Sequence, residues 1–216
     1  MFMNDYNLWM LFIVISSYLL GSIPTAYIAA RINKVNIFEI GSGNMGATNV
    51  SRALGIRWGI GVMLFDMLKG MVAILIAIQV TPSSVAAGMT VSAISVIIGH
   101  NWSLFASLLT GTLKGGKGAA TAFGTLVMIA PWQVIAITAV IGLIIVLLTR
   151  YVSLGVLTTF FFALIWTLVL ILQEQMDATF MIYTVAVGVM LMLRFRENIY
   201  RLRTGTERRL GDRAQT

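Results

Sequence analysis

The residues best suited to chemistry form a polar, glycine-rich run between two long apolar segments. Residues 41–55 read GSGNMGATNVSRALG. Because glycine adopts positive φ at little cost, such a run can turn successive backbone N–H groups toward one point and form a nest for an anion. The candidate ligand groups are the N–H groups around Gly41, Gly43 and Gly46, the side chains of Ser42, Asn44, Thr48 and Asn49, and the guanidinium of Arg52. The pattern predicts a cradle for a phosphate group.

A second glycine-rich segment, residues 111–118, reads GTLKGGKG and nearly matches a nucleotide-binding P-loop. Gly118 stands where Ser or Thr would bind magnesium, and the surroundings lack the strand–loop–helix pattern of a soluble nucleotide-binding domain. We favour an anion-binding loop that does not bind a nucleotide. In such a loop, backbone N–H groups, lysine side chains and the N-terminus of the next helix face the anion. The residues concerned are Lys114, Gly115, Gly116, Lys117, Gly118 and Thr121. The alternative is a flexible, positively charged cytoplasmic loop, which the two lysines among four nearby glycines make less attractive.

A third polar segment, residues 194–211, reads RFRENIYRLRTGTERRLG and follows the last apolar run. Part of it is typical of a basic juxtamembrane helix that is attracted to anionic headgroups. Glu197, Asn198 and Arg201 fall at one-turn spacings close to the apolar run, where they can face the other two segments. Glu197 and Arg201 also have the i,i+4 spacing of an ordinary ion pair.

Three further ionisable residues lie in apolar surroundings. His100 is the only histidine of the chain, and it is either a general base or a hydrogen-bonded residue at a helix end, of which we favour the second. Asp66 and Lys69 are three positions apart, so they share a helix face and are expected to form a buried pair.

The composition is that of a membrane protein. The chain has 216 residues, of which 58% are hydrophobic and 11% charged, whereas soluble domains carry about a quarter charged residues. The absence of cysteine and the scatter of eight acids and one histidine predict neither a disulfide nor a metal site. The net charge of +7 does not indicate nucleic acid, because the basic residues punctuate apolar spans and form no basic face.

Charge placement decides the number of membrane spans. The stretch 119–148 is one long helix or two helices broken at Pro131, the first of them about 18 Å long against a ~30 Å hydrocarbon core. Two helices give seven spans and bring all 15 basic residues to one side. One helix gives six spans and puts the arginines of the tail opposite the glycine-rich loops, against the positive-inside rule. The expected spans are about 8–30, 56–80, 85–98, 119–130, 132–149, 151–172 and 178–193.

We therefore predict an all-α integral membrane protein that forms a single polytopic domain over residues 1–216. Its seven helices place the N-terminus outside and the basic tail, about 194–216, in the cytoplasm, and the fourth helix is short. The start of the chain lacks the features of a cleaved signal peptide. Pro24 is expected to kink the first helix, with Ser22 and Thr25 helping to satisfy the freed backbone groups.

Together, GSGNMGATNVSRALG, LKGGKGAAT and RFRENIYRLRTGTE resemble, in order and spacing, the motifs of the bacterial acyl-phosphate:glycerol-3-phosphate acyltransferases. The resemblance covers nearly the whole chain. It implies a seven-helix bundle in the bacterial cytoplasmic (inner) membrane with its active site on the cytoplasmic side and no cofactor. It also implies transfer of a fatty acyl group from acyl phosphate to glycerol 3-phosphate, which gives 1-acyl-glycerol 3-phosphate and phosphate as the first step of phospholipid synthesis. The soluble enzyme that makes acyl phosphate would be a transient partner.

The resemblance extends to single positions: Ser42 and Arg52 match essential polar residues of the first family motif, Lys114 and Lys117 match the second, and Asn198 and Glu197 the third. Taking the resemblance and the residue chemistry together, we predict that Ser42, Arg52, Lys114 and Asn198 are catalytic. The predicted substrate contacts are Gly41, Gly43, Asn44, Gly46, Thr48, Asn49, Gly115, Gly116, Lys117, Gly118, Thr121, Glu197 and Arg201. The chain departs from the family pattern in having Met45, a longer interval between His100 and Lys114, and Phe195 where many members have histidine.

The expected mechanism is direct attack of the acceptor hydroxyl on the acyl carbonyl, with N–H groups and a lysine stabilising the oxyanion. Ser42 as an acyl-enzyme nucleophile is disfavoured, because no histidine lies near it in sequence. The alternative function is a transporter for a small phosphorylated or other anion. The absence of an internal repeat and the gathering of all three segments on one side argue against transport.

Overall fold

The computed structural model describes residues 2–212, and over that range it is all helical, as predicted. The helices are α1 (Phe2–Gly21), α2 (Thr25–Ile32), α3 (Ala47–Leu54), α4 (Ile56–Val80), α5 (Val85–Asn101), α6 (Leu104–Thr110), α7 (Ala119–Ile129), α8 (Trp132–Thr149), α9 (Val152–Leu172) and α10 (Phe180–Arg203). The last four residues of the predicted basic tail lie outside the described residues.

Five helical segments in the described part of the chain are long and apolar enough to cross a membrane. They are Asp5–Ile32, Ile56–Val80, Val85–Thr110, Trp132–Thr149 and Val152–Leu172. The break at Pro131 is present, and the helix before it, α7, is short, as expected. The helix α10 is 24 residues long, but only its first part is apolar and the part from Arg194 onward is charged. The length of α10 therefore does not by itself show that it spans a membrane.

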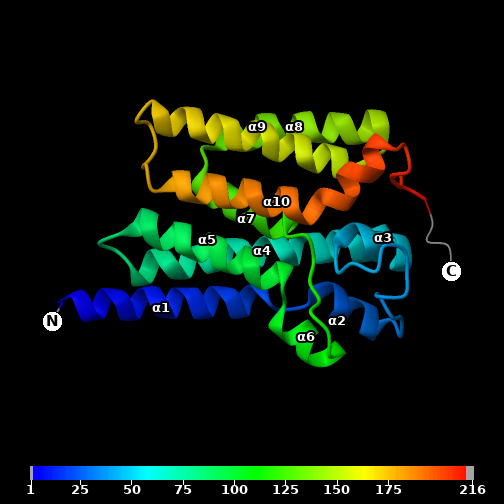
Figure 1. The fold of residues 1–216 in the computed structure, drawn as a ribbon, viewed down its shortest axis with the longest axis horizontal. Coiled ribbons are helices and arrows are strands. Elements are labelled where there is room, and N and C mark those ends of the chain that lie inside the picture. Colours follow the sequence, from blue (N-terminus) through cyan, green and yellow to red (C-terminus); the bar gives the residue numbers. More distant parts are fainter. Residues whose placement is uncertain (1, 213–216) are drawn as a thin grey trace. The chain divides into compact units, whose positions relative to one another are not determined.

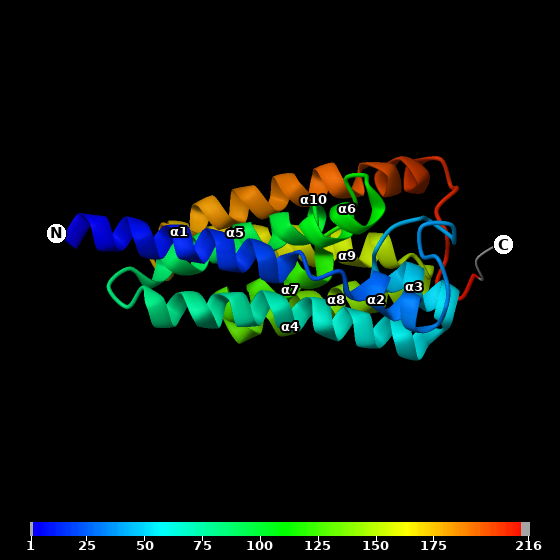
Figure 2. The ribbon, with the colours of Figure 1, turned by 90° about the horizontal axis from the view of Figure 1, so that it is seen from below.

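The contacts divide the chain into two compact units, residues 2–128 and 129–212, each with its own packing. In the first unit, α1, α4 and α5 contact one another along their lengths, while α2 and α3 pack on α4 (Figures 1 and 2). In the second unit, α9 packs antiparallel against both α8 and α10 (Figure 1).

Small residues let α1 and α5 approach closely. A Cβ atom on Gly99 would collide with the carbonyl oxygen of Tyr18. The hydroxyls of Ser17 and Ser92 hydrogen-bond across the same contact at 2.9 Å. Close backbone contact between small residues, with a hydroxyl pair between the helices, is the usual way in which helices associate where lipid removes the hydrophobic driving force.

The first span is broken at Pro24, where the sequence predicts a kink. α1 ends at Gly21 and α2 begins at Thr25. The carbonyls freed by the break accept hydrogen bonds from other elements: Ser103 Oγ donates to the oxygen of Ser22 (2.5 Å), and Lys69 Nζ donates to that of Ile23 (3.2 Å). The expectation that local hydroxyls would satisfy these groups was therefore wrong for both carbonyls.

Two short helices occur where the sequence analysis expected loops. α3 lies within the glycine-rich run, because residues after Gly46 turn an apolar face inward that includes Val50, which is fully buried beside Ala26 and Ala30. α6 lies in the long interval before Lys114, and Ser103 caps it by accepting the N–H of Ala106 at 3.0 Å.

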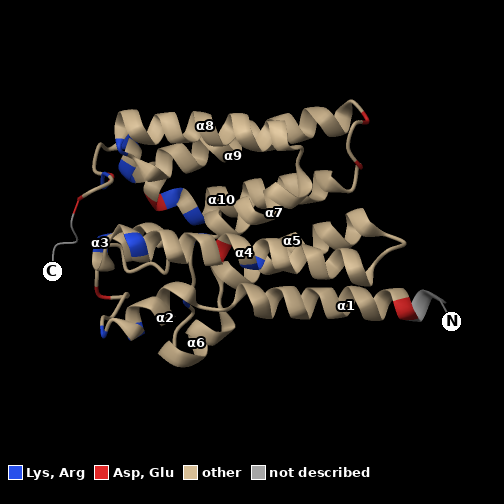
Figure 3. Ribbon diagram, turned by 180° about the vertical axis from the view of Figure 1, so that it is seen from behind, with Lys and Arg blue, Asp and Glu red and all other residues tan. Residues whose placement is uncertain are grey.

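In the second unit the charges are concentrated at the two ends of the helices. Figure 3 shows acidic residues at the turn between α9 and α10, and basic residues mainly at the opposite end, where α8 and α10 finish. The helical lengths of α8 and α9 between them carry no charge. This polarity is the one that the positive-inside rule uses to orient helices.

The close α1–α5 contact predicts a sharp difference between two glycine-to-alanine substitutions. Gly99→Ala should lower the thermal unfolding temperature in detergent strongly, because the added methyl group would meet the Tyr18 carbonyl. Gly61→Ala, in α4 with open space at the Cβ position, should be neutral or raise that temperature, because alanine favours helix by roughly 0.5–1 kcal/mol. Equal effects of the two substitutions would contradict the packing described.

Candidate active site

The first glycine-rich loop has the backbone conformation expected at two of its three glycines. Gly41 (φ 62°) and Gly43 (φ 64°) lie in the left-handed region, which side chains disfavour. The third prediction was wrong: Gly46 is extended (φ −125°), because it is the residue from which α3 begins. The loop thus combines two tight turns with a helix N-terminus.

Asn49 holds this loop together. Its side chain is buried, and Oδ1 accepts the N–H of Ser42 at 2.9 Å, while Nδ2 donates to the carbonyls of Ile40 (3.0 Å) and Ile37 (3.3 Å). The sequence analysis expected Asn49 to contact substrate, but these contacts give its carboxamide a role inside the loop. Asn44 also bonds within the loop, to the carbonyl of Ser42 at 3.2 Å.

Three other predicted residues of the first segment, Ser42, Thr48 and Arg52, are half-buried. Ser42 lies in the turn between the two left-handed glycines. Thr48 and Arg52 lie in α3, on its first and last turns. Half-burial leaves part of each residue exposed to solvent, although the Nε atom of Arg52 is buried.

The second glycine-rich loop is fastened to the end of α5 and to α6. The N–H of Gly116 donates to the carbonyl of His100 at 3.0 Å, and the N–H of Ser103 donates to that of Lys114 at 2.9 Å. The N–H of Lys114 in turn donates to Ser107 Oγ at 3.1 Å. The helix α6 and its capping residue are therefore hydrogen-bonded to the second loop and stabilise it.

The two loops meet in the first unit. Lys114 Nζ lies over the ring of Phe38, 5.1 Å from its centroid, a cation–π distance. A Cβ on Gly116 would meet the carbonyl oxygen of Met45 at 2.8 Å and collide with the His100 ring. Only glycine fits at this position, so glycine here allows the close approach of the two loops.

Behind the second loop lie two buried polar side chains, those of Asn101 and Thr121. Asn101, which the sequence analysis did not consider, is buried, with its Oδ1 against Gly118 at the start of α7. Thr121, which it expected to bind substrate, is completely buried in α7. The spacing pattern had no signal for Asn101, because a single amide at a helix end has no periodicity.

A buried polar network lies beside the loops. Asp66 Oδ1 accepts hydrogen bonds from Lys69 Nζ (2.9 Å) and Thr25 Oγ1 (2.5 Å), and His100 Nδ1 lies 3.7 Å from the same oxygen. The expected Asp66–Lys69 pair is confirmed. The contacts with Thr25 and His100 were missed, since these residues come from two other helices.

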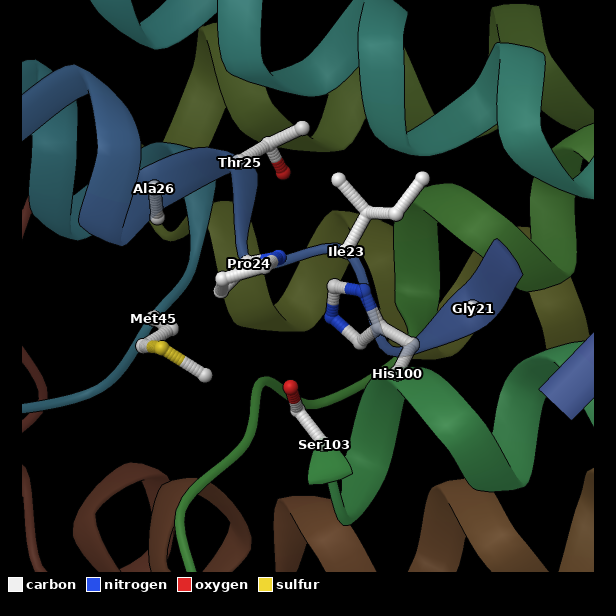
Figure 4. A pocket seen from close by; sticks show the side chains of 8 residues that line it. All are labelled: Gly21, Ile23, Pro24, Thr25, Ala26, Met45, His100 and Ser103. Atoms are coloured by element: carbon white, nitrogen blue, oxygen red, sulfur yellow. The ribbon is translucent and has the colours of Figure 1, made fainter. Parts of the chain in front are cut away.

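A small cavity adjoins this network (Figure 4). Its volume is about 10 Å³, roughly what one water molecule needs. Its walls are Gly21, Ile23, Pro24, Thr25, Ala26, Met45, His100 and Ser103. The break in the first span, the first glycine-rich loop and the end of α5 thus enclose one space.

In the second unit, the third polar segment is organised around a residue to which the sequence analysis gave no role. The Glu207 side chain, only 6% exposed, accepts hydrogen bonds from Asn198 Nδ2 (2.6 Å), Arg201 Nε (2.7 Å) and Ser153 Oγ (2.9 Å). The predicted Glu197–Arg201 pair is present at 3.7 Å, but the Glu197 side chain is 66% exposed. Glu207 is the last residue of the motif RFRENIYRLRTGTE. The motif therefore included this residue, but nothing in the sequence indicated that it accepts these hydrogen bonds.

Hydrogen bonds of Arg150, from both its side chain and its main chain, fasten the tail to the turn between α8 and α9. Arg150 donates from Nε and Nη2 to the carbonyl of Leu210, at 3.1 and 2.7 Å, and its own carbonyl accepts the N–H of Leu210 at 2.6 Å. Phe195 is buried in α10, and this environment suits its apolar ring.

The pKa of Glu207 is lowered, and the cause is hydrogen bonding. Burial of the carboxyl group opposes ionisation, but the hydrogen bonds from Arg201, Asn198 and Ser153 and the positive charge of Arg201 outweigh it. The carboxylate therefore contributes stability above its ordinary pKa of 4.5, and this contribution disappears as the pH falls through the lower folded-state value.

Glu207→Gln should lower the thermal unfolding temperature at pH 7 and have a smaller effect near pH 3, where the native carboxyl group is losing its charge. The expected loss at pH 7 is about 1–3 kcal/mol, because three donors lose a charged acceptor. Unfolding in detergent at both pH values measures it. Glu197→Gln, at the exposed acid one residue before Asn198, is the control and should change little. Equal effects of the two substitutions would contradict the assignment.

The chain is similar to known glycerol-3-phosphate acyltransferases over most of its length. A sequence profile described as glycerol-3-phosphate acyltransferase matches residues 11–205. The glycerol-3-phosphate acyltransferase of Halalkalibacterium halodurans is 40% identical over 211 residues, which cover 96% of this chain and 98% of that protein. The enzyme of that name from Thermus thermophilus is 41% identical over 200 residues, which cover 92% of this chain and 94% of that protein.

Two solved structures are similar along most of their length. They are crystal structures of PlsY, an integral membrane glycerol 3-phosphate acyltransferase, at 37% identity. The glycerol 3-phosphate form gives a TM-score of 0.81 and covers 94% of this chain and 96% of that one. The lysophosphatidic acid form gives 0.80, with 94% and 95% covered. The chain is therefore a multi-pass membrane protein, and it belongs to the glycerol-3-phosphate acyltransferase family.

Proposed function

We propose that the protein transfers a fatty acyl group from acyl phosphate to glycerol 3-phosphate, giving 1-acyl-glycerol 3-phosphate and inorganic phosphate. The observation that carries this proposal is the meeting of two glycine-rich loops, the first followed by Arg52 in α3 and the second containing Lys114, in a member of the acyltransferase family. The two similar PlsY structures are forms with glycerol 3-phosphate and with lysophosphatidic acid. These are the acceptor and the product of the proposed reaction.

The donor follows from the chemistry of the loops. Both proposed substrates carry phosphate, and backbone N–H groups with fixed cations are suited to two such groups. An acyl phosphate is a mixed anhydride whose phosphate leaves readily, so the site needs no cofactor to activate it. The soluble enzyme that makes acyl phosphate is the proposed transient partner.

The reaction proceeds by direct transfer. The primary hydroxyl oxygen of glycerol 3-phosphate attacks the acyl carbonyl, the new C–O bond forms, and the bond from the carbonyl carbon to the phosphate oxygen breaks. The hydroxyl proton passes to the departing phosphate. The N–H groups of both loops and a lysine stabilise the oxyanion, and Arg52 holds the acceptor's phosphate. Asn198, Glu197 and Arg201 are candidates for substrate contact on the basis of the resemblance.

The membrane arrangement is part of the proposal. We infer seven spans in one polytopic domain, with the N-terminus outside and the site on the cytoplasmic side of the bacterial inner membrane. Five long apolar helices, the short α7 and the apolar part of α10 supply the seven spans. In the second unit, the concentration of basic residues at one end of its helices supports the orientation (Figure 3).

Arg52→Ala should lower kcat/KM for glycerol 3-phosphate about 100-fold, because a guanidinium bound to phosphate supplies two charge-assisted hydrogen bonds. The purified protein in detergent, with acyl phosphate and labelled glycerol 3-phosphate, provides the assay. Arg57→Ala is the matched control, since Arg57 is an exposed arginine five positions later and should behave as the parent protein. Near-normal turnover of the Arg52 variant, with normal folding, removes Arg52 from the site.

Direct transfer predicts that no acyl-enzyme forms. When the protein is mixed with acyl phosphate alone and quenched within one turnover, intact-mass analysis should show no added acyl group on Ser42. Acyl-CoA should give no product in place of acyl phosphate. Burst release of phosphate together with a trapped acyl-Ser42 species would instead establish a two-step mechanism.

A further inference from the structure

His100 lies between the buried carboxylate of Asp66 and the second glycine-rich loop. On one side its Nδ1 is 3.7 Å from Asp66 Oδ1. On the other side its ring edge, at Nε2, fills the space in which a Gly116 side chain would lie, and its carbonyl accepts the Gly116 N–H at 3.0 Å. Both the main chain and the side chain of His100 therefore define where the loop runs.

The carboxylate behind His100 is itself held in place. Lys69 pairs with Asp66 at 2.9 Å and also donates to the carbonyl of Ile23 in the break of the first span. Thr25, just after the break, donates to the same Asp66 oxygen. Because an uncompensated buried charge is costly, this set of contacts resists rearrangement. It gives the imidazole a rigid support.

Burial argues against proton transfer by His100 itself. The residue is only 7% exposed, its Nε2 lies beside Gly116, and the cavity that it lines is only about 10 Å³ in volume, too small for a substrate. A general base needs hydrogen-bond reach to the proton that it removes. The surrounding contacts fix the position of the imidazole ring and leave no route by which a substrate hydroxyl could reach it.

We propose that His100, oriented by Asp66, is a positioning residue that fixes the second glycine-rich loop and thereby the N–H groups and cations of residues 114–118. This inference rests on the proposed function, in which that loop binds a substrate phosphate. Without the imidazole, the loop loses its packing beside Gly116 and is less ordered before substrate binds. Binding of the substrate phosphate must then order the loop, and the free energy needed for this weakens substrate binding.

The kinetic test compares two substitutions. His100→Ala should raise KM for at least one of the two phosphate substrates about tenfold, with kcat within about threefold of the parent. His100→Gln should restore most of the loss, because its amide reaches the space beside Gly116. A fall of about 100-fold in kcat with KM unchanged, and loss of one limb of the pH–rate profile, would show a general base and overturn the proposal.

The role of Asp66 is tested with the double substitution Asp66→Asn and Lys69→Met, which removes both buried charges together. Adding His100→Ala to that background should raise KM by no more than about twofold, because all three residues act on one loop. A further tenfold increase would mean that His100 acts independently of Asp66. Thr90→Val, at a buried hydroxyl of α5 outside the network, is the matched control.

Limited proteolysis tests the loop without any assay of acyl transfer. Lys114 and Lys117 are trypsin sites held in a packed loop, so the folded parent protein should be cut there slowly. His100→Ala and the double variant should be cut at these two lysines at least about tenfold faster, while Thr90→Val should not. Unchanged cleavage in the first two variants overturns the proposal. If the parent makes no product but the cleavage rates differ as stated, the proposed function fails and the loop role stands.

Discussion

The buried carboxylate of Asp66 is the interaction on which the first unit depends. It lies on a membrane-spanning helix, where an isolated charge is very unfavourable, and it is compensated by partners from three directions. Lys69 neutralises it from the same helix, Thr25 hydrogen-bonds to it from beyond the broken first span, and His100 approaches from the end of α5. The Asp66 carboxylate therefore connects the break in the first span with the end of α5.

This linkage explains why irregular backbone is tolerated near the membrane. The break at residues 22–24 frees carbonyls that lipid cannot satisfy, and Ser103 and Lys69 bond to them. Ser103 also caps α6, to which the second glycine-rich loop is hydrogen-bonded. The polar interior of the unit thus stabilises the fold and the glycine-rich loops by shared contacts. In the second unit, Glu207 has a similar function, because it orients Asn198 and Arg201 with one buried carboxylate.

The sequence was sufficient for the helical class, the break at Pro131, the short α7 and the Asp66–Lys69 pair, because each depends on composition, proline chemistry or helical spacing. It was also sufficient for the family, since three motifs in one order are specific. The helices α3 and α6 were missed, because tertiary packing of Val50 and capping by Ser103 decide them. Asn49 was expected to bind substrate, but its three contacts are internal to the loop. Contacts between distant helices, such as His100 with Asp66, leave no periodic pattern in the sequence.

The most direct test of the account is the stoichiometry of the reaction catalysed by the purified protein in detergent. With acyl phosphate and labelled glycerol 3-phosphate and no closed membrane compartment, the account predicts equal amounts of 1-acyl-glycerol 3-phosphate and inorganic phosphate at every time point. Release of phosphate without acylated product, or acylation that requires acyl-CoA, would contradict it.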